Sequence, residues 1–304
     1  MGFTLIDAIV IVIYLIAVAV FGIWSAGTQK TTNDYFLGGR AMPWWAILFS
    51  VVATETSTLT FISIPAVAYG GSLTFLQLTF GYILGRIIVA LWFLPAYVEG
   101  ELTTAYQYLE QRFGSGMRKA ASSTFIITRL LADGVRLFAT AIPLAIIFRF
   151  AGVFDGWGDM EIYLMAISLI SGITLIYTFL GGIKAVIWMD VVQMVVYIGG
   201  ALFALVILIG NLSVSFPEAI TSLNDAGKFT LFNWGGGLSW SEFISDPYVF
   251  WIALFGGAVF SIASHGTDQL IVQRLLATGN LKSSQKALIW SGFVASAQFG
   301  LFLF

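Results

Sequence analysis

The residues best suited to binding chemistry form one short run, Thr54-Glu55-Thr56-Ser57-Thr58, inside a long apolar segment. Glu55 is the only charged residue between positions 41 and 85. A charged side chain at the centre of a membrane-spanning helix costs about 2.5–3.5 kcal/mol even on lenient insertion scales. Glu55 therefore predicts a specialised site, because an ordinary span avoids such a residue.

The same run predicts that the helix opens at this point. Threonine and serine side chains compete for backbone hydrogen bonds, and Pro65 removes one further helical hydrogen bond. Freed carbonyl groups at membrane depth are tolerated only where they face a cavity. Together with hydroxyls and a carboxylate, they form an oxygen cage that suits a small hard cation. The helix that starts near Ser57 points its positive end at the same cavity and could hold an anionic or polar solute. The alternative is a continuous span whose hydroxyl groups bond back to their own backbone.

Composition places the chain among polytopic α-helical membrane proteins that lie in a lipid bilayer. Hydrophobic residues make up 59% of the 304 residues and charged residues only 10%, whereas soluble domains contain about 25% charged residues. The absence of cysteine excludes disulfide and thiol chemistry, and a single histidine excludes a transition-metal cluster. The net charge of -2 argues against a nucleic-acid partner.

The hydropathy pattern divides the chain into eight expected spans. The first, at residues 6–25, is interpreted as a peripheral helix outside the working core, and the broken helix at 43–71 follows. The other six are expected at about residues 72–98, 119–149, 161–180, 184–209, 248–276 and 284–304, with closure of the third at Pro95. Gly181-Gly182 predicts a sharp turn, residues 103–113 an interfacial helix stopped by Gly114 and Gly116, and residues 211–247 a long extracellular loop.

One expected span carries a compensated charge cluster. Arg129, Asp133 and Arg136 are spaced i, i+4 and i+7 and therefore share one helical face. Such a cluster serves either as a structural lock or as a contact in transport.

Basic residues predict the orientation by the positive-inside rule. With the N-terminus outside, the outer loops hold only Arg149 and Lys228. The inner loops then hold nine basic residues, namely Lys30, Arg40, Arg112, Arg118, Lys119, Lys184, Arg274, Lys282 and Lys286. We therefore expect a multi-pass protein of the plasma (inner) membrane with its N-terminus outside.

The last expected span reaches the final residue without a polar tail. About 20 residues are needed to cross the hydrocarbon core, and residues 284–304 barely supply them. We therefore expect a C-terminally truncated chain.

Four stretches together resemble the sodium:solute symporter family, which includes the sodium/glucose, sodium/proline, sodium/iodide and sialic-acid transporters. They are WWAILFSVVATETSTLTFISIPAVAYGG, TAYQYLEQRFG, IYTFLGGIKAVIWMDVVQMVVYIGG and HGTDQLIVQRLLATGNLKSSQKAL, in the family's order and spacing. The resemblance implies an all-α leucine-transporter-type fold with inverted repeats and one extra N-terminal helix. The first repeat would be residues 43–210, the extracellular loop 211–247, and an incomplete second repeat 248–304. Inverted repeats place ion and solute at the midplane between broken helices.

The resemblance also implies the sodium site and the sodium path. The backbone carbonyls of Ala53 and Thr56 match the family's sodium ligands, and the remaining ligands would come from an eighth core helix that this chain lacks. Glu55 stands where the proline-transporter branch carries an acidic side chain, and it could serve sodium, substrate or a proton, with sodium ranked first. Ser57 is the fourth residue expected at the sodium site. Asp190 matches the aspartate of the family's TDxxQ motif on the path to the cytoplasm, although Met189 replaces the usual threonine.

Six residues match the family's substrate positions. They are Ser57, Thr60, Gln77, Ser261, Ser264 and His265. Sugar transporters carry a Tyr-Trp pair where Ser264-His265 stands, which argues against a simple sugar transporter. The alternative for His265 is a packed, hydrogen-bonded core histidine.

The function implied is sodium-coupled secondary active symport, which imports a small polar organic solute by alternating access with Na+ as the coupling ion and no cofactor. The alternative is a channel-like or sensory membrane module built on the same fold. An enzyme is not expected, because His265 and Asp268 lack a nucleophile partner. Without the eighth core helix, the 304-residue form is expected not to transport by itself.

Overall fold

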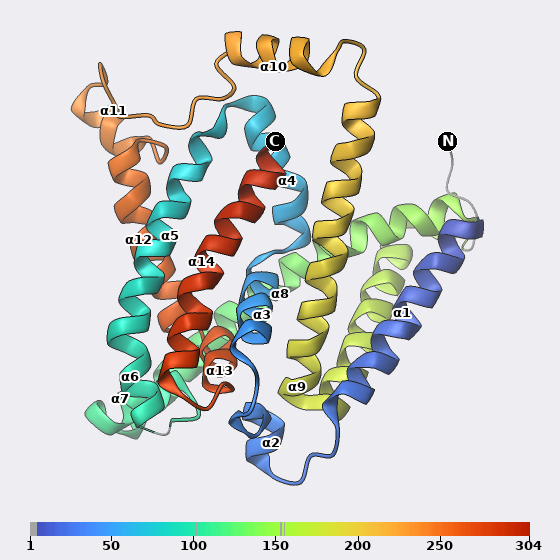
Figure 1. Cartoon of the computed structure of the whole chain (residues 1–304). Coiled ribbons are helices and arrows are strands. Elements are labelled where there is room, and N and C mark those ends of the chain that lie inside the picture. Colours follow the sequence, from blue (N-terminus) through green and yellow to red (C-terminus); the bar gives the residue numbers. More distant parts are fainter. Residues whose placement is uncertain (1–4, 101, 153, 155) are drawn as a thin grey trace.

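The computed structural model describes residues 5–100, 102–152, 154 and 156–304, and all regular elements in these ranges are helices (Figure 1). The first half of the chain forms α1 Leu5–Ala26, α2 Thr32–Leu37, α3 Trp44–Glu55, α4 Thr58–Gly70, α5 Leu76–Ile88, α6 Leu94–Glu99, α7 Ala105–Phe113 and α8 Ser115–Phe150. The second half forms α9 Asp159–Gly210, α10 Phe216–Asp225, α11 Trp240–Ser245, α12 Phe250–Gly266, α13 Gln269–Leu276 and α14 Leu281–Leu303.

Within the described ranges, six helices are long and apolar enough to cross a membrane. The number rises to seven if the pair Thr32–Arg40 and Trp44–Glu55, bent by 107°, counts as one span. The expected multi-pass character is thus confirmed by length and composition.

Two expected helix ends differ from the structure. The third span does not close at Pro95, because a π-helical segment, Val89–Phe93, leads directly into α6, where this proline occupies the first turn. The π-helical turn just before it accommodates the proline, because such a turn already departs from the regular α-helical hydrogen bonds. Of the two glycines expected to stop the interfacial helix, only Gly114 does so, and Gly116 lies inside α8.

The expected turn at Gly181-Gly182 is present inside α9. Gly182 adopts φ 54° and ψ −157°, so the fifth and sixth expected spans meet at a sharp reversal within one 52-residue element. A Cβ atom at this position would lie 2.7 Å from the Tyr35 carbonyl oxygen and 3.0 Å from Gln29 Oε1. The side chain of Gln29 donates a hydrogen bond to the Gly181 carbonyl, which anchors the reversal to the segment before α2.

Gly182→Ala is expected to lower the free energy of unfolding by about 1–3 kcal/mol, since the backbone conformation is strained for any L side chain and the added methyl meets the Tyr35 backbone. Thermal unfolding in detergent measures the effect. Gly199→Ala is the matched control, because a Cβ at this position of the same helix meets nothing within 4 Å. Equal stability of the two variants would contradict the assignment of strain to Gly182.

The seventh expected span, residues 248–276, is broken, which agrees with the broken helices that the family resemblance implies for the start of each inverted repeat. α12 ends at Gly266, and α13 starts at Gln269 after the non-helical residues Thr267 and Asp268. The Asp268 side chain caps α13 by accepting a hydrogen bond from the Leu270 N–H at 2.8 Å. Two helices are thus broken within the described residues, α3–α4 and α12–α13, and they run in opposite directions (Figure 1).

The long loop at residues 211–247 contains the two short helices α10 and α11, which lie across one end of the bundle (Figure 1). Each opens with a capping box, Ser215 with Glu218 and Ser239 with Glu242. Hydrogen bonds from the Ser215 side chain and backbone N–H lower the pKa of Glu218. The loop is therefore locally ordered.

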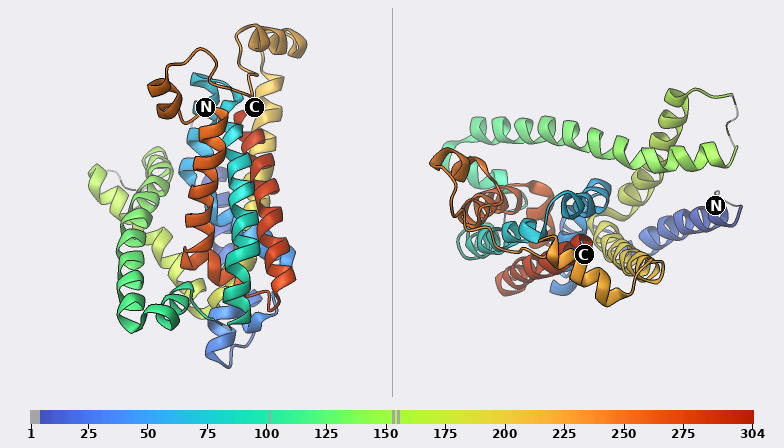
Figure 2. Two further views of the ribbon diagram at one scale, coloured as in Figure 1. Left: turned by 90° about the vertical axis from the view of Figure 1, so that its left-hand side faces the viewer. Right: turned by 90° about the horizontal axis from the view of Figure 1, so that it is seen from above.

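The main core forms where α3, α6, α13 and α14 meet, and it buries Ile47, Leu94, Val272 and Leu288 completely. α5 and α12 pack closely against each other where α5 carries glycines. A Cβ atom at Gly81 would lie 2.4 Å from the Leu254 carbonyl oxygen. α1 and α8 extend away from this core (Figure 2).

Candidate functional site

The predicted break in the first helix is confirmed. α3 ends at Glu55, and the backbone is extended at Thr56 (φ −84°, ψ 107°) and at Ser57 (φ −101°, ψ 167°). A capping box then starts α4, in which Ser57 Oγ accepts from the Thr60 N–H at 3.2 Å and Thr60 Oγ1 accepts from the Ser57 N–H at 3.3 Å. The continuous-helix alternative is excluded, although the hydroxyls of Thr54 and Thr56 do bond back to carbonyls of α3.

Thr56 also joins a polar network that the sequence did not indicate. Gln298 Nε2 on α14 donates to Thr56 Oγ1 at 2.7 Å, and the Tyr197 hydroxyl on α9 donates to Gln298 Oε1 at 2.7 Å. Ala53 packs one turn earlier against the cluster of Val52, Met194 and Ala295. The two residues expected to offer carbonyls to sodium therefore lie where α3 meets α9 and α14.

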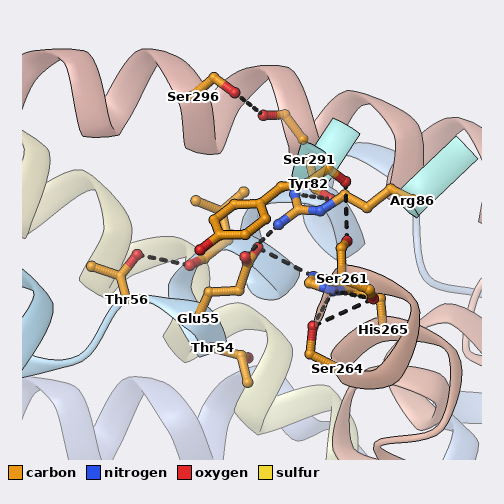
Figure 3. Close-up of polar contacts among 12 residues, drawn as sticks. Thr54, Glu55, Thr56, Tyr82, Arg86, Ser261, Ser264, His265, Ser291 and Ser296 are labelled. Atoms are coloured by element: carbon orange, nitrogen blue, oxygen red, sulfur yellow. Dashed lines mark hydrogen bonds and ion pairs between the residues drawn. The ribbon is translucent and has the colours of Figure 1, made fainter. Parts of the chain in front are cut away.

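The carboxylate of Glu55 lies between two side chains from different helices (Figure 3). Its Oε2 forms an ion pair with Arg86 Nη2 of α5. Its Oε1 lies 3.6 Å from Nε2 of His265, which is on α12 just before the second break. The two helix breaks are thus brought together at Glu55.

Both partners of Glu55 make further polar contacts that fix their positions. Arg86 Nη1 donates to Ser291 Oγ of α14 at 2.9 Å, and the Arg86 side chain is 0% exposed. His265 Nδ1 lies 2.8 Å from Ser264 Oγ and 3.2 Å from the Ser261 carbonyl oxygen. No sequence motif indicated a role for Arg86 or Ser291, and the signal that could have found Arg86 is a charged residue inside an apolar span.

The six expected substrate residues fall into separate groups. His265 lies beside Glu55 and Ser264 contacts the other ring nitrogen of His265, whereas Ser57 and Thr60 pair with each other at the start of α4. Ser261 donates to the Tyr82 carbonyl at 3.0 Å and so joins α12 to α5.

Gln77 lies apart from the other expected substrate residues. It is completely buried, donates to the Tyr248 carbonyl at 2.8 Å and accepts from the Asn233 N–H at 3.0 Å. It precedes Arg86 by nine residues on α5, about 14 Å along a helix axis. Gln77 therefore anchors the long loop to the bundle.

Asp190 lies away from Glu55, in a buried cluster of its own. It accepts a hydrogen bond from Ser50 of α3 and forms an ion pair with Arg274 of α13, whose Nη2 lies 3.1 Å from Asp190 Oδ2. Arg274 Nε also donates to Ser50 Oγ at 2.9 Å. This cluster joins three helices that are remote in sequence.

The charge cluster of α8 exists and gains a second carboxylate, Asp268. Arg129 lies 3.0 Å from Asp133 and 3.4 Å from Asp268, and Arg136 lies 3.9 Å from Asp133. Because Asp268 caps α13, this contact ties α8 to the second helix break. The contact fits the structural alternative for the cluster.

Comparison with known proteins assigns the family. Residues 35–304 match the model of the sodium:solute symporter family. The chain is 34% identical over 291 residues to the sodium/sialic acid symporter NanT of Aliivibrio fischeri, covering 95% of this chain and 54% of NanT. It is 30% identical over 290 residues to the human sodium/iodide cotransporter, covering 93% of this chain and 41% of the cotransporter.

A solved structure of a Na+-coupled sialic acid symporter, in a substrate-bound outward-open state, superimposes with a TM-score of 0.84 at 30% identity. The match covers 99% of this chain and 60% of that protein, and the chain spans about half the length of the curated relatives it matches. The likeness confirms the expected leucine-transporter-type fold. The chain belongs to the sodium:solute symporter family, which consists of sodium-coupled transporters and not enzymes.

Proposed function

We propose that this chain works in a sodium-coupled secondary active symporter that imports a small polar organic solute by alternating access. The observation that carries the proposal is the meeting of the two helix breaks at Glu55, where His265 of α12 lies 3.6 Å from the carboxylate that ends α3. Broken helices from two inverted repeats are the usual place for ion and solute in such folds. Relatives named for sialic acid and monocarboxylate transport make an organic anion the first solute to test.

In this proposal, sodium binds at the break of α3–α4, with the carbonyls of Ala53 and Thr56 as ligands and Glu55 and Ser57 assisting. Ser264 and His265 contact the solute from α12, and Ser57 and Thr60 contact it from α4. Asp190 lies on the sodium path, and Gln77 acts indirectly by holding the long loop.

The test is uptake by the complete protein in proteoliposomes. We expect a radiolabelled solute such as sialic acid to accumulate only with an inward sodium gradient, and faster with a negative interior, since the potential contributes about 2.3 kcal/mol per charge per 100 mV. Glu55→Ala is expected to weaken the sodium dependence of uptake. Unaltered sodium dependence would show that Glu55 is not part of the sodium site. A symporter moves sodium and solute in a fixed ratio, whereas a variable ratio would support the channel-like alternative.

We further propose that the N-terminus lies outside, in the plasma (inner) membrane. The end of the bundle that carries α2, α7 and α13 would then face the cytoplasm (Figure 1). Residues 1–304 contain no cysteine, so single cysteines introduced there report the topology once any cysteine elsewhere in the complete protein is replaced by serine. We expect an impermeant maleimide to label Ser213→Cys in intact cells and Lys282→Cys only after permeabilisation, and the reverse pattern would invert the topology.

A further inference from the structure

We infer that Arg86 is the receptor for an anionic group of the solute, and that the Glu55 carboxylate occupies this receptor until sodium draws it away. Sodium and solute would then bind by an exchange of ion-pair partners. The inference rests on the proposed function and names the solute as an organic anion, with a carboxylate as the best fit.

The contacts of the pair indicate which partner moves. The Arg86 side chain is 0% exposed and is fixed by Ser291 of α14, whereas the Glu55 side chain is 20% exposed. Glu55 is also the last residue of α3, next to extended backbone at Thr56. The guanidinium is therefore the fixed element, and the carboxylate can turn toward the proposed sodium ligands at the break.

The pairing in the cluster is incomplete. Within the part of the chain that the structure describes, three buried side-chain polar atoms have no hydrogen-bond partner, and all three belong here: Glu55 Oε1, Arg86 Nε and His265 Nε2. Buried polar groups in proteins are normally satisfied, and a buried ion pair is favourable only when its remaining donors and acceptors are bonded. Their concentration at one point indicates a site that is built for another ligand.

The unused donor of Arg86 has the geometry that a carboxylate needs. Nε and Nη2 lie on the same edge of the guanidinium and together form the fork that holds two carboxylate oxygens. Glu55 engages only Nη2 and leaves Nε free. A solute carboxylate, which is not tethered to α3, can place one oxygen on each donor, and His265 Nε2 is available as a further polar contact.

Charge pairing explains why the exchange requires sodium. If Glu55 left Arg86 in the absence of sodium, the buried guanidinium and the partly buried carboxylate would both lose their partners, which is strongly unfavourable. With sodium at the break and the solute anion at Arg86, both charges remain paired. Each ligand therefore favours binding of the other, which is positive coupling between two sites.

Sodium alone provides the first test. Binding of radioactive sodium to the purified complete protein is measured without solute. Arg86→Gln frees Glu55 and is expected to raise the sodium affinity about tenfold, within the roughly 5–150-fold range of coupling between sites. Arg149→Gln, which removes an exposed ion pair with Asp159, is the matched control and should leave the affinity unchanged. Unchanged or weaker sodium binding by folded Arg86→Gln would overturn the inference.

Acetate provides a second test that does not depend on the solute. Glu55→Ala leaves the receptor empty, so acetate is expected to raise its thermal unfolding temperature above that in an equal concentration of chloride. The same comparison should show no difference for the wild type or for the double variant Glu55→Ala/Arg86→Gln. If acetate acts no better than chloride on Glu55→Ala, Arg86 is a structural counter-ion and not a receptor.

The two tests also separate this inference from the proposed function. A wild-type protein that binds no sodium would contradict the proposed symport itself. A wild-type protein that binds sodium, together with an Arg86→Gln variant that binds it no better, would contradict only the exchange.

Discussion

Replacing Arg274 by methionine is expected to lower the free energy of unfolding by about 3–5 kcal/mol, because it leaves Asp190 buried without its counter-ion. The Arg274 side chain is 8% exposed and that of Asp190 15%. The pair, with Ser50, joins α3, α9 and α13, so the loss affects three helices at once. Thermal or denaturant unfolding in detergent micelles measures the change.

The double variant Asp190→Asn/Arg274→Met is the control for this effect. Removing both charges eliminates the unpaired carboxylate, so most of the lost stability should return. If Arg274→Met alone is as stable as the wild type, the ion pair does not hold these helices together. The double variant also tests the sodium path. Normal uptake by a stable protein without Asp190 would show that this residue is not needed on that path.

Gly85→Ala is expected to cost about 1–3 kcal/mol and to abolish uptake, because a Cβ atom at this position would lie 2.5 Å from the Ala258 carbonyl oxygen and 2.6 Å from Ser261 Cβ. The contact is with backbone, which cannot rotate away, so α5 and α12 must separate. Arg86 follows Gly85 on α5, and His265 stands on α12. Separation of these helices would therefore pull both partners away from Glu55.

Gly256→Ala is the matched control for Gly85→Ala. Gly256 lies on α12, but a Cβ atom there meets nothing within 4 Å, and alanine favours a helix over glycine by about 1 kcal/mol. We expect Gly256→Ala to keep or raise stability and to retain uptake. Uptake by Gly85→Ala at the level of this control would show that the close contact between α5 and α12 is not needed.

The sequence determined the features that depend on local chemistry. Apolar composition requires membrane helices, because only elements that satisfy their own backbone hydrogen bonds are stable in lipid. The hydroxyl-rich run at residues 54–58 located the first helix break to within a residue, since its side chains start α4 through the Ser57–Thr60 capping box. The reversal at Gly182 followed from a backbone conformation that favours glycine. The second break carried a weaker local signal, Asp268 as a helix cap, which stood among other polar residues of the same span.

Only the tertiary structure decided which charges meet. Glu55 and Arg86 are separated by 31 positions, and Asp190 and Arg274 by 84. Gln77 shares a helix with Arg86 but serves the long loop instead of the site. No local pattern encodes such pairs, because they depend on how closely whole helices approach, and that distance is set by glycines such as Gly81 and Gly85. The sequence alone therefore predicts that a buried carboxylate needs a partner, whereas helix packing determines that the partner is Arg86.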